Sequence, residues 1–285
     1  MTGTDPIIDE SSFTGAGGLQ LYSRCWRPTG SPRALVALVH GISEHSGRYG
    51  SLVGPLTASG FAVCSFDLRG HGRSPGQHGH INSWSEYRED VRDFLAHVRR
   101  EVPDRPVFLY GHSLGALIVA EYVLSYPEGL VGLIVSGIPL KPVGIGKPYL
   151  VVAARILTHV LPRLSVSLGV DGSKVTRDPA IARAYEDDPL VHHTATMRWG
   201  TESLAAIERV KSRAPEIRLP ILILHGGSDR VNSVEGSKEL FAKVSSADKQ
   251  LLIYPGGAHE PHNDLEREQV ARDVEEWLTR HLTVA

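Results

Sequence analysis

The sequence predicts an α/β protein with a mostly parallel central sheet of about eight strands, flanked by helices. Short runs rich in Val, Ile and Leu alternate along the 285 residues with longer segments of helical period, which is typical of βαβ units. Several of these runs lack polar alternation, as do strands that helices cover on both faces. The composition, 41% hydrophobic and 22% charged, supplies enough apolar side chains for a globular core.

Seven apolar runs are predicted to be strands, and five segments of helical period are predicted to be helices. The strands are Leu21 to Trp26, Ala34 to His40, Phe61 to Asp67, Val107 to Gly111, Leu130 to Ser136, Ile221 to His225 and Gln250 to Tyr254. The helices are Arg48 to Ser59, Trp84 to Arg100, Leu114 to Ser125, Ser233 to Ser245 and Asn263 to His281. In the last helix, the apolar residues expected on one face are Leu265, Val270, Val274, Trp277 and Leu278.

The alternation of strands and helices stops in residues 140–215, which contain apolar helical stretches but no convincing strand. We therefore expect a core built from residues 1–139 and 216–285, interrupted by a helical cap in residues 140–215. The cap has 11 basic and 7 acidic residues, a net charge of +4, whereas the rest of the chain has −6. Its main apolar runs are Tyr149 to Val152, Ile156 to Leu157 and Val160 to Leu161.

Two interpretations of this cap stand side by side. A basic, apolar insertion on an acidic body is typical of a segment that faces a membrane. A helical excursion that packs on the core, with its charges in solvent, accounts for the same pattern.

Charge and hydropathy exclude several classes of protein. A formal net charge of −2 gives no basic surplus for binding nucleic acid, and no apolar run approaches the roughly 18 residues of a membrane span. The N-terminus lacks the basic and apolar segments of a signal peptide. We expect a cytoplasmic protein that can contact a membrane peripherally, through the cap. Cys25 and Cys64 fall in predicted strands, where we expect small buried thiols.

Ser113 stands in a G-x-S-x-G pattern, Gly111 to Gly115, between a predicted strand and a predicted helix. Strand, sharp turn and helix form the setting that a nucleophile elbow needs. Small residues beside the serine permit strained backbone angles, and the helix N-terminus favours developing negative charge. The sequence therefore predicts a nucleophilic Ser113.

A serine hydroxyl needs a base, and the base needs a group that stabilises imidazolium. Asp229 and His259 each follow the carboxyl end of a predicted strand, where sites of open α/β sheets are built. Their order along the chain, Ser, Asp and His, is that of a nucleophile-elbow enzyme. His262 competes for the role of base, but Gly256 to Ala258 give His259 the closer approach.

Acyl transfer also requires N–H donors for the oxyanion. The backbone N–H of Leu114, directly after the serine, is predicted to be one donor. The N–H of Ile42 is predicted to be the second, because His40 and Gly41 end an early strand and Gly41 permits a turn. A simple strand-ending turn is the alternative at Gly41.

These residues belong to five segments that resemble the monoglyceride lipase and lysophospholipase branch of the α/β-hydrolase superfamily. The segments are HGISEHSGRY at 40–49, FDLRGHGRS at 66–74, GHSLGA at 111–116, HGGSDRV at 225–231 and YPGGAHEPHND at 254–264. The resemblance covers nearly the whole chain. It implies the α/β-hydrolase fold, a cap over an apolar acyl tunnel, and cleavage of single-chain lipid esters such as monoacylglycerols or lysophospholipids. The triad that it implies is Ser113, Asp229 and His259, and the oxyanion donors that it implies are Ile42 and Leu114.

The resemblance also implies that Glu44, Arg48 and His262 meet the polar head group of the substrate. A structural ion pair is the alternative for Glu44 and Arg48. A broad carboxylesterase or a prolyl-type aminopeptidase uses the same fold, and a hydrolase-like receptor with an idle triad belongs to a different functional class.

No cofactor is expected. The histidines at positions 78, 80, 192 and 193 have no cysteine or well-spaced third ligand near them in the sequence, so we interpret them as loop residues. The Gly70 to Gly72 stretch lacks the rest of a dinucleotide-binding pattern.

Overall fold

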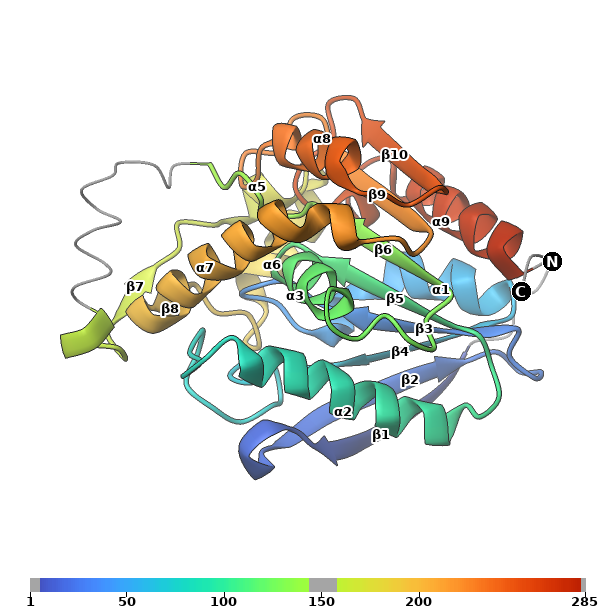
Figure 1. Ribbon diagram of the computed structural model, residues 1–285, viewed down its shortest axis with the longest axis horizontal. Helices are drawn as coiled ribbons and strands as arrows, with labels where there is room; N and C mark the ends of the chain where they lie inside the picture. Colours follow the sequence, from blue (N-terminus) through green and yellow to red (C-terminus); the bar gives the residue numbers. More distant parts are fainter. Residues whose placement is uncertain (1–5, 144–157, 283–285) are drawn as a thin grey trace.

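The computed structural model describes residues 6–143 and 158–282, which form one eight-stranded sheet with helices on both faces (Figure 1). The strand order is β1-β2-β4-β3-β5-β6-β9-β10, antiparallel along β1, β2 and β4 and parallel from β4 onward. The strands are β1 (Ile7–Thr14), β2 (Gln20–Arg27), β3 (Ala34–Val39), β4 (Phe61–Phe66), β5 (Val107–His112), β6 (Gly132–Ser136), β9 (Ile221–Gly226) and β10 (Lys249–Tyr254). This architecture confirms the predicted fold class.

Five helices cover the sheet within the described residues: α1 (Gly50–Ala58), α2 (Ser85–Glu101), α3 (Leu114–Val123), α8 (Val234–Lys243) and α9 (Arg267–Leu282). Side chains of α1 and α9 belong to one hydrophobic cluster, and those of α2, α3 and α8 belong to a second. Strand β3 is buried throughout, and its residues alternate between the two clusters. Both faces therefore require apolar side chains, which is why the central strands showed no polar alternation.

Within the central sheet, β1 is the strand that the sequence pattern missed. It lies at the edge of the sheet, and six of its first seven residues are exposed, with Phe13 alone reaching the core. An edge strand with little burial has no strong hydrophobic signal to detect.

The predicted placement of Leu265 was wrong. Helix α9 begins at Arg267, and Leu265 is 58% exposed in the segment before it. A short 3₁₀ turn, η4 (Pro261–Asn263), and the buried side chain of Asp264 redirect the chain there, so the apolar face starts at Val270.

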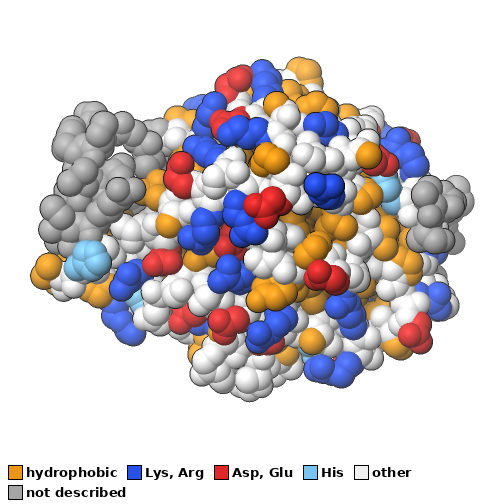
Figure 2. Space-filling model, viewed as in Figure 1, with side chains coloured by type: hydrophobic (Ala, Val, Ile, Leu, Met, Phe, Trp, Pro, Cys, Tyr) orange, Lys and Arg blue, Asp and Glu red, His pale blue; other side chains and the backbone are white. Residues whose placement is uncertain are grey.

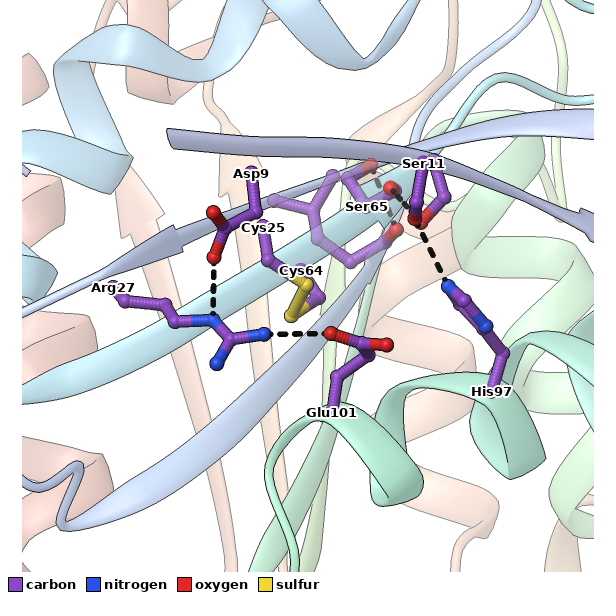
Figure 3. Close-up of a disulfide and its surroundings, with 10 residues drawn as sticks. Asp9, Ser11, Cys25, Arg27, Cys64, Ser65, His97 and Glu101 are labelled. Atoms are coloured by element: carbon purple, nitrogen blue, oxygen red, sulfur yellow. Dashed lines mark hydrogen bonds and ion pairs between the residues drawn. A yellow bond between two sulfur atoms is a disulfide. The ribbon is translucent and has the colours of Figure 1, made fainter. Parts of the chain in front are cut away.

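The expectation of two separate buried thiols was also wrong. Cys25 in β2 lies directly opposite Cys64 in β4, and the two form a disulfide with their Cα atoms 4.0 Å apart. Figure 3 shows it beneath β1, beside Arg27, which bridges Asp9 and Glu101. The bond ties the antiparallel edge of the sheet to its parallel part.

Between β6 and β9, where the cap is expected, the described residues form six elements. They are β7 (Ser165–Ser167), α5 (Gly172–Val175), α6 (Pro179–Asp187), β8 (Thr194–Thr196), α7 (Met197–Arg213) and the 3₁₀ turn η3 (Ala214–Glu216). Strands β7 and β8 pair antiparallel, so the expectation of no strand in this region was wrong. Three residues per strand are too few for a periodic signal. The apolar runs at 149–152 and 156–157 lie outside the described residues.

Helix α7 packs against α3, and the segment that contains α5 is hydrogen-bonded to the loop after β10, at the carboxyl end of the parallel strands (Figure 1). The exact limits of the cap, residues 140 and 215, stay a prediction. Among the residues that the structure describes, no helix has the length and hydropathy to cross a bilayer.

Candidate active site

Ser113 lies in a sharp turn between β5 and α3 at the carboxyl edge of the sheet. Its φ of 51° falls in the left-handed region, which non-glycine residues adopt mainly where the surrounding structure enforces it. Gly115 makes the turn possible, because a Cβ there would collide with the carbonyl oxygen of Val39. Helix α3 can therefore approach β3 closely, and Ser113 is held at the junction, 4% exposed.

The side chains of Ser113, His259 and Asp229 form a continuous hydrogen-bonded chain. Nε2 of His259 lies 2.9 Å from Ser113 Oγ, and its Nδ1 lies 2.8 Å from Asp229 Oδ2. Asp229 follows β9 and His259 follows β10, so neighbouring parallel strands deliver them to one edge. Since Nδ1 donates to the carboxylate, Nε2 is left to accept the serine proton.

Electrostatics prepare this chain for proton transfer. Burial opposes a charged imidazole, but the adjacent Asp229 carboxylate outweighs burial and raises the pKa of His259 above its usual value. Burial likewise opposes a charged carboxyl, yet His259 and further hydrogen bonds lower the pKa of Asp229. The lowered pKa favours an ionised Asp229 beside His259, an arrangement that can stabilise an imidazolium.

His225 is a second partner of Asp229 that sequence reasoning missed. Its Nε2 lies 3.2 Å from Asp229 Oδ2, while its Nδ1 lies 2.7 Å from Ser237 Oγ. The other carboxylate oxygen, Oδ1, accepts the N–H groups of Val231 and Asn232. The position of His225 at the end of β9 was the available signal, but a side chain inside a buried strand is ordinarily interpreted as core.

His262 does not join this chain. Its ring stacks on Tyr49 with centroids 4.6 Å apart and meets His112 edge to face, and neither ring nitrogen has a hydrogen-bond partner among the described residues. Burial lowers the pKa of His262 to about 4. Of the two candidate bases, the structure brings His259 to Ser113.

Hydrogen bonds hold the loop after β3, so the peptide group that joins Gly41 to Ile42 has a fixed orientation. His40 accepts the Leu68 N–H at Nε2, so its Nδ1 carries the proton and donates to the Gly41 carbonyl at 2.7 Å. The Gly41 N–H donates to Glu44 Oε1 at 2.6 Å. Because the C=O and N–H of a trans peptide point in opposite directions, a fixed Gly41 carbonyl directs the Ile42 N–H away from His40.

This loop packs directly against the serine. A Cβ on Gly41 would lie 3.0 Å from Ser113 Cβ, so only glycine fits there without displacement. On the other side, Leu114 begins α3, and its N–H has no carbonyl one turn earlier in the helix to bond. The two expected oxyanion donors thus come from segments that meet at Ser113.

Glu44 and Arg48 lie in a buried charged cluster with Glu260. Arg48 donates to Glu260 Oε2 at 2.8 Å, and its Nε lies 3.6 Å from Glu44 Oε2. Burial and the neighbouring Glu260 carboxylate raise the pKa of Glu44. The ion-pair alternative for these residues is therefore present in the structure, although Glu44 Oε2 and Arg48 Nε have no hydrogen-bond partner among the described residues.

The remaining histidines make ordinary contacts or ring stacks. His80 lies 3.0 Å from Thr196 Oγ1, His193 contacts the Val170 carbonyl, and His78 stacks on His192. Within the described ranges no group of three or more His, Cys, Asp or Glu side chains could hold a metal ion.

Comparison with known proteins supplies the family. The family model described as "Serine aminopeptidase, S33" matches residues 30–266. A monoacylglycerol lipase of Mycolicibacterium smegmatis is 36% identical over 96% of this chain and 98% of its own length, and a human monoglyceride lipase is 32% identical over 98% of this chain and 93% of its own.

A solved structure agrees with these relatives. The crystal structure of a Paleococcus ferrophilus monoacylglycerol lipase matches with a TM-score of 0.82 and 35% identity, over 92% of this chain and 99% of that one. The chain thus belongs to the serine aminopeptidase S33 family and, within the α/β-hydrolase superfamily, to its monoglyceride lipase branch.

Proposed function

We propose that the protein is a serine hydrolase that cleaves single-chain lipid esters, with monoacylglycerol as its preferred substrate, through an acyl-enzyme on Ser113. The observation that carries this proposal is the hydrogen-bonded chain from Ser113 Oγ through His259 to Asp229, at 2.9 and 2.8 Å. The lipase names of relatives that match nearly the whole chain support the substrate class.

In the acylation step, His259 Nε2 takes the proton of Ser113 while Oγ attacks the ester carbonyl carbon. The carbonyl oxygen becomes an oxyanion, which the N–H groups of Ile42 and Leu114 stabilise. One such donor is typically worth about 10²–10³ in rate. As the tetrahedral intermediate collapses, the bond to the alcohol oxygen breaks, and His259 returns the proton to that oxygen, releasing glycerol.

Deacylation repeats these steps with water. His259 takes a proton from the water molecule, the resulting hydroxide attacks the acyl carbon, and the proton returns to Ser113 Oγ as the fatty acid leaves. Asp229 remains ionised throughout. No cofactor takes part in this scheme.

The head-group contacts of this proposal involve Glu44, Arg48 and His262. Each has a buried polar atom without a hydrogen-bond partner among the described residues: Oε2, Nε, and both ring nitrogens respectively. Glu44 Oε2 and Arg48 Nε form an ion pair at 3.6 Å, which is too long for a hydrogen bond. Buried polar atoms normally have hydrogen-bond partners, so these atoms are suited to a ligand with hydroxyl groups. A glycerol head group supplies both donors and acceptors.

The membrane part of the proposal rests on the outer end of the cap. Val160 and Leu161 are 71% and 49% exposed, and Leu164 and Val166 are exposed as well. Figure 2 shows a few hydrophobic side chains at this end, with Lys and Arg side chains close by. Apolar side chains flanked by basic ones suit the interface of an anionic bilayer.

Cleavage of aminoacyl amides is the second candidate, favoured by the description of the family model and by Glu44 Oε2, which accepts no hydrogen bond from the described residues and could hold a free amine. A panel of monoacylglycerol, diacylglycerol, triacylglycerol, lysophospholipid, short-chain ester and aminoacyl amide, compared by initial rates, separates the candidates. We expect monoacylglycerol to give the highest kcat/KM. A faster aminoacyl amide would transfer the proposal to peptidase chemistry, and no turnover with retained binding would favour a receptor.

A further inference from the structure

Asp264 is a fully buried carboxylate that connects the loop of His259 to the cap. Its Oδ2 accepts the backbone N–H of Ala258 at 2.7 Å and Nε of Arg177 at 2.9 Å. Its Oδ1 accepts the backbone N–H of Arg177 at 2.8 Å and the hydroxyl of Thr176 at 3.3 Å. One side chain thus joins the residue directly before the proposed base to two residues of the cap.

The backbone of the base is itself attached to the cap. The N–H of His259 donates to the Lys174 carbonyl at 3.4 Å, and the N–H of Glu260 donates to the Val175 carbonyl at 2.8 Å. The three consecutive N–H groups from Ala258 to Glu260 therefore depend on Asp264 and on cap carbonyls.

The charge of Asp264 suits it to this task. Burial opposes ionisation, but the N–H groups of Ala258 and Arg177 and the Arg177 guanidinium lower its pKa. An ionised carboxylate that accepts several N–H bonds makes stronger hydrogen bonds than a neutral group does. The contacts reach no atom of Ser113 or Asp229, so the side chain acts on the site only through the loop.

We propose that Asp264 is a positioning residue for His259, and that it makes cap segment 174–177 part of the catalytic scaffold. This inference rests on the proposed function, in which His259 is the base. Asp264 sets the height of the imidazole over Ser113, and the cap contributes to proton transfer as well as to substrate access. A displacement of about 1 Å in a reacting group can cost 10²-fold in rate.

The central experiment compares Asp264→Asn with Asp178→Asn. The asparagine keeps the size of the side chain but loses its charge and turns an amide NH₂ toward N–H donors. We expect kcat for monoacylglycerol to fall roughly 10- to 100-fold with little change in KM, measured well below the unfolding temperature. Asp178 is the control, since it directly follows cap segment 174–177 and its carboxylate pairs with Arg267 at 2.9 Å, accepting no hydrogen bond from residues 258–260. Its variant should retain the wild-type kcat.

A second comparison tests whether Asp264 acts through His259. In a His259→Ala background the residual hydrolysis of an activated ester should be the same with and without the Asp264→Asn change, because two changes to one functional unit are not additive. A further loss in that background would overturn the positioning role. If Asp264→Asn does not fold, Arg177→Gln removes one cap contact of the carboxylate and should lower kcat more weakly, again without raising KM.

Labelling with a fluorophosphonate separates a failure of the positioning inference from a failure of the proposed function. If Ser113→Ala abolishes labelling while Asp264→Asn is labelled as fast as the wild type and has the same kcat, the positioning inference is wrong and the proposed function stands. If Ser113→Ala remains active, the proposed function itself fails.

Discussion

Glu44 Oε1 accepts the Gly41 N–H at 2.6 Å, so a residue expected to meet the head group also holds the loop that carries an oxyanion donor. The same oxygen accepts the Tyr49 hydroxyl at 2.7 Å. Glu44 therefore lies between the proposed head-group site and the loop of the expected oxyanion donor Ile42, with Oε1 bonded to that loop and Oε2 3.6 Å from Arg48 Nε. A shift of the loop would disturb the hydrogen bond at Oε1.

Replacement of Glu44 should therefore affect turnover as well as binding. Glu44→Ala removes the acceptor of the Gly41 N–H, and we expect a loss in kcat of about 10²–10³-fold, comparable with the loss of an oxyanion donor. Glu44→Gln retains a carbonyl oxygen for Gly41 and Tyr49 and should remain within about tenfold of the wild type. Steady-state kinetics on monoacylglycerol check this. A rise in KM alone for Glu44→Ala would reduce Glu44 to a head-group contact.

Ser113→Ala should abolish ester hydrolysis, since loss of a triad nucleophile typically costs about 10⁶-fold in rate. Labelling by a fluorophosphonate should disappear with the activity, while circular dichroism should show an unchanged fold. Appreciable activity in a preparation free of contaminating esterases would contradict the assignment of the nucleophile.

His259→Ala should be nearly as severe as loss of the serine, and His262→Ala much milder. Of these two histidines, His259 lies within hydrogen-bond distance of Ser113 Oγ, whereas His262 stacks on Tyr49. Initial rates of the two purified variants, measured where both are folded, show which substitution costs more activity. The opposite order would transfer the role of base to His262.

The rate should fall on acidification, because only neutral His259 can accept the serine proton. Since Asp229 raises the pKa of His259, kcat/KM should decline through a midpoint above 6.5, the ordinary histidine value. Asp229→Asn removes the charge that raises this pKa, so the midpoint should move to lower pH while the plateau rate drops. A pH profile of both proteins tests the sign, and an unmoved midpoint would exclude His259 as the titrating group.

Membrane contact should depend on salt and on anionic lipid. Each Lys or Arg near an anionic surface adds roughly 1 kcal/mol, a contribution that salt screens, and the exposed Val160 and Leu161 add an apolar contribution. Co-sedimentation with vesicles at low and high salt measures both. Leu161→Ser should weaken vesicle binding. Leu265→Ser changes another exposed leucine, which lies outside the cap, and should leave vesicle binding unchanged. Negligible vesicle binding in every condition would support the alternative in which the cap packs on the core and makes no membrane contact.

Local sequence patterns predicted much of the architecture. The central strands were visible because two layers of helices require each of them to be apolar on both faces, and Ser113 was visible because a strand, a small-residue turn and a helix are neighbours in sequence. Asp229 and His259 could be expected at one edge because parallel strands end together. These inferences depend on short-range order and on the general geometry of parallel sheets.

Contacts between distant segments had no such signal. The pairing of Cys25 with Cys64 depends on which strands are neighbours, and the Asp264 carboxylate finds a cap partner 87 residues away. The contact of His225 with Asp229 joins residues only four apart, but it forms because the turn after β9 folds back on that strand. Burial converts each of these polar groups into one that must find a partner, and the partner is whichever group the folded chain brings near. The sequence therefore identified the residue types. Which group each of them contacts was decided by the packing of the folded chain.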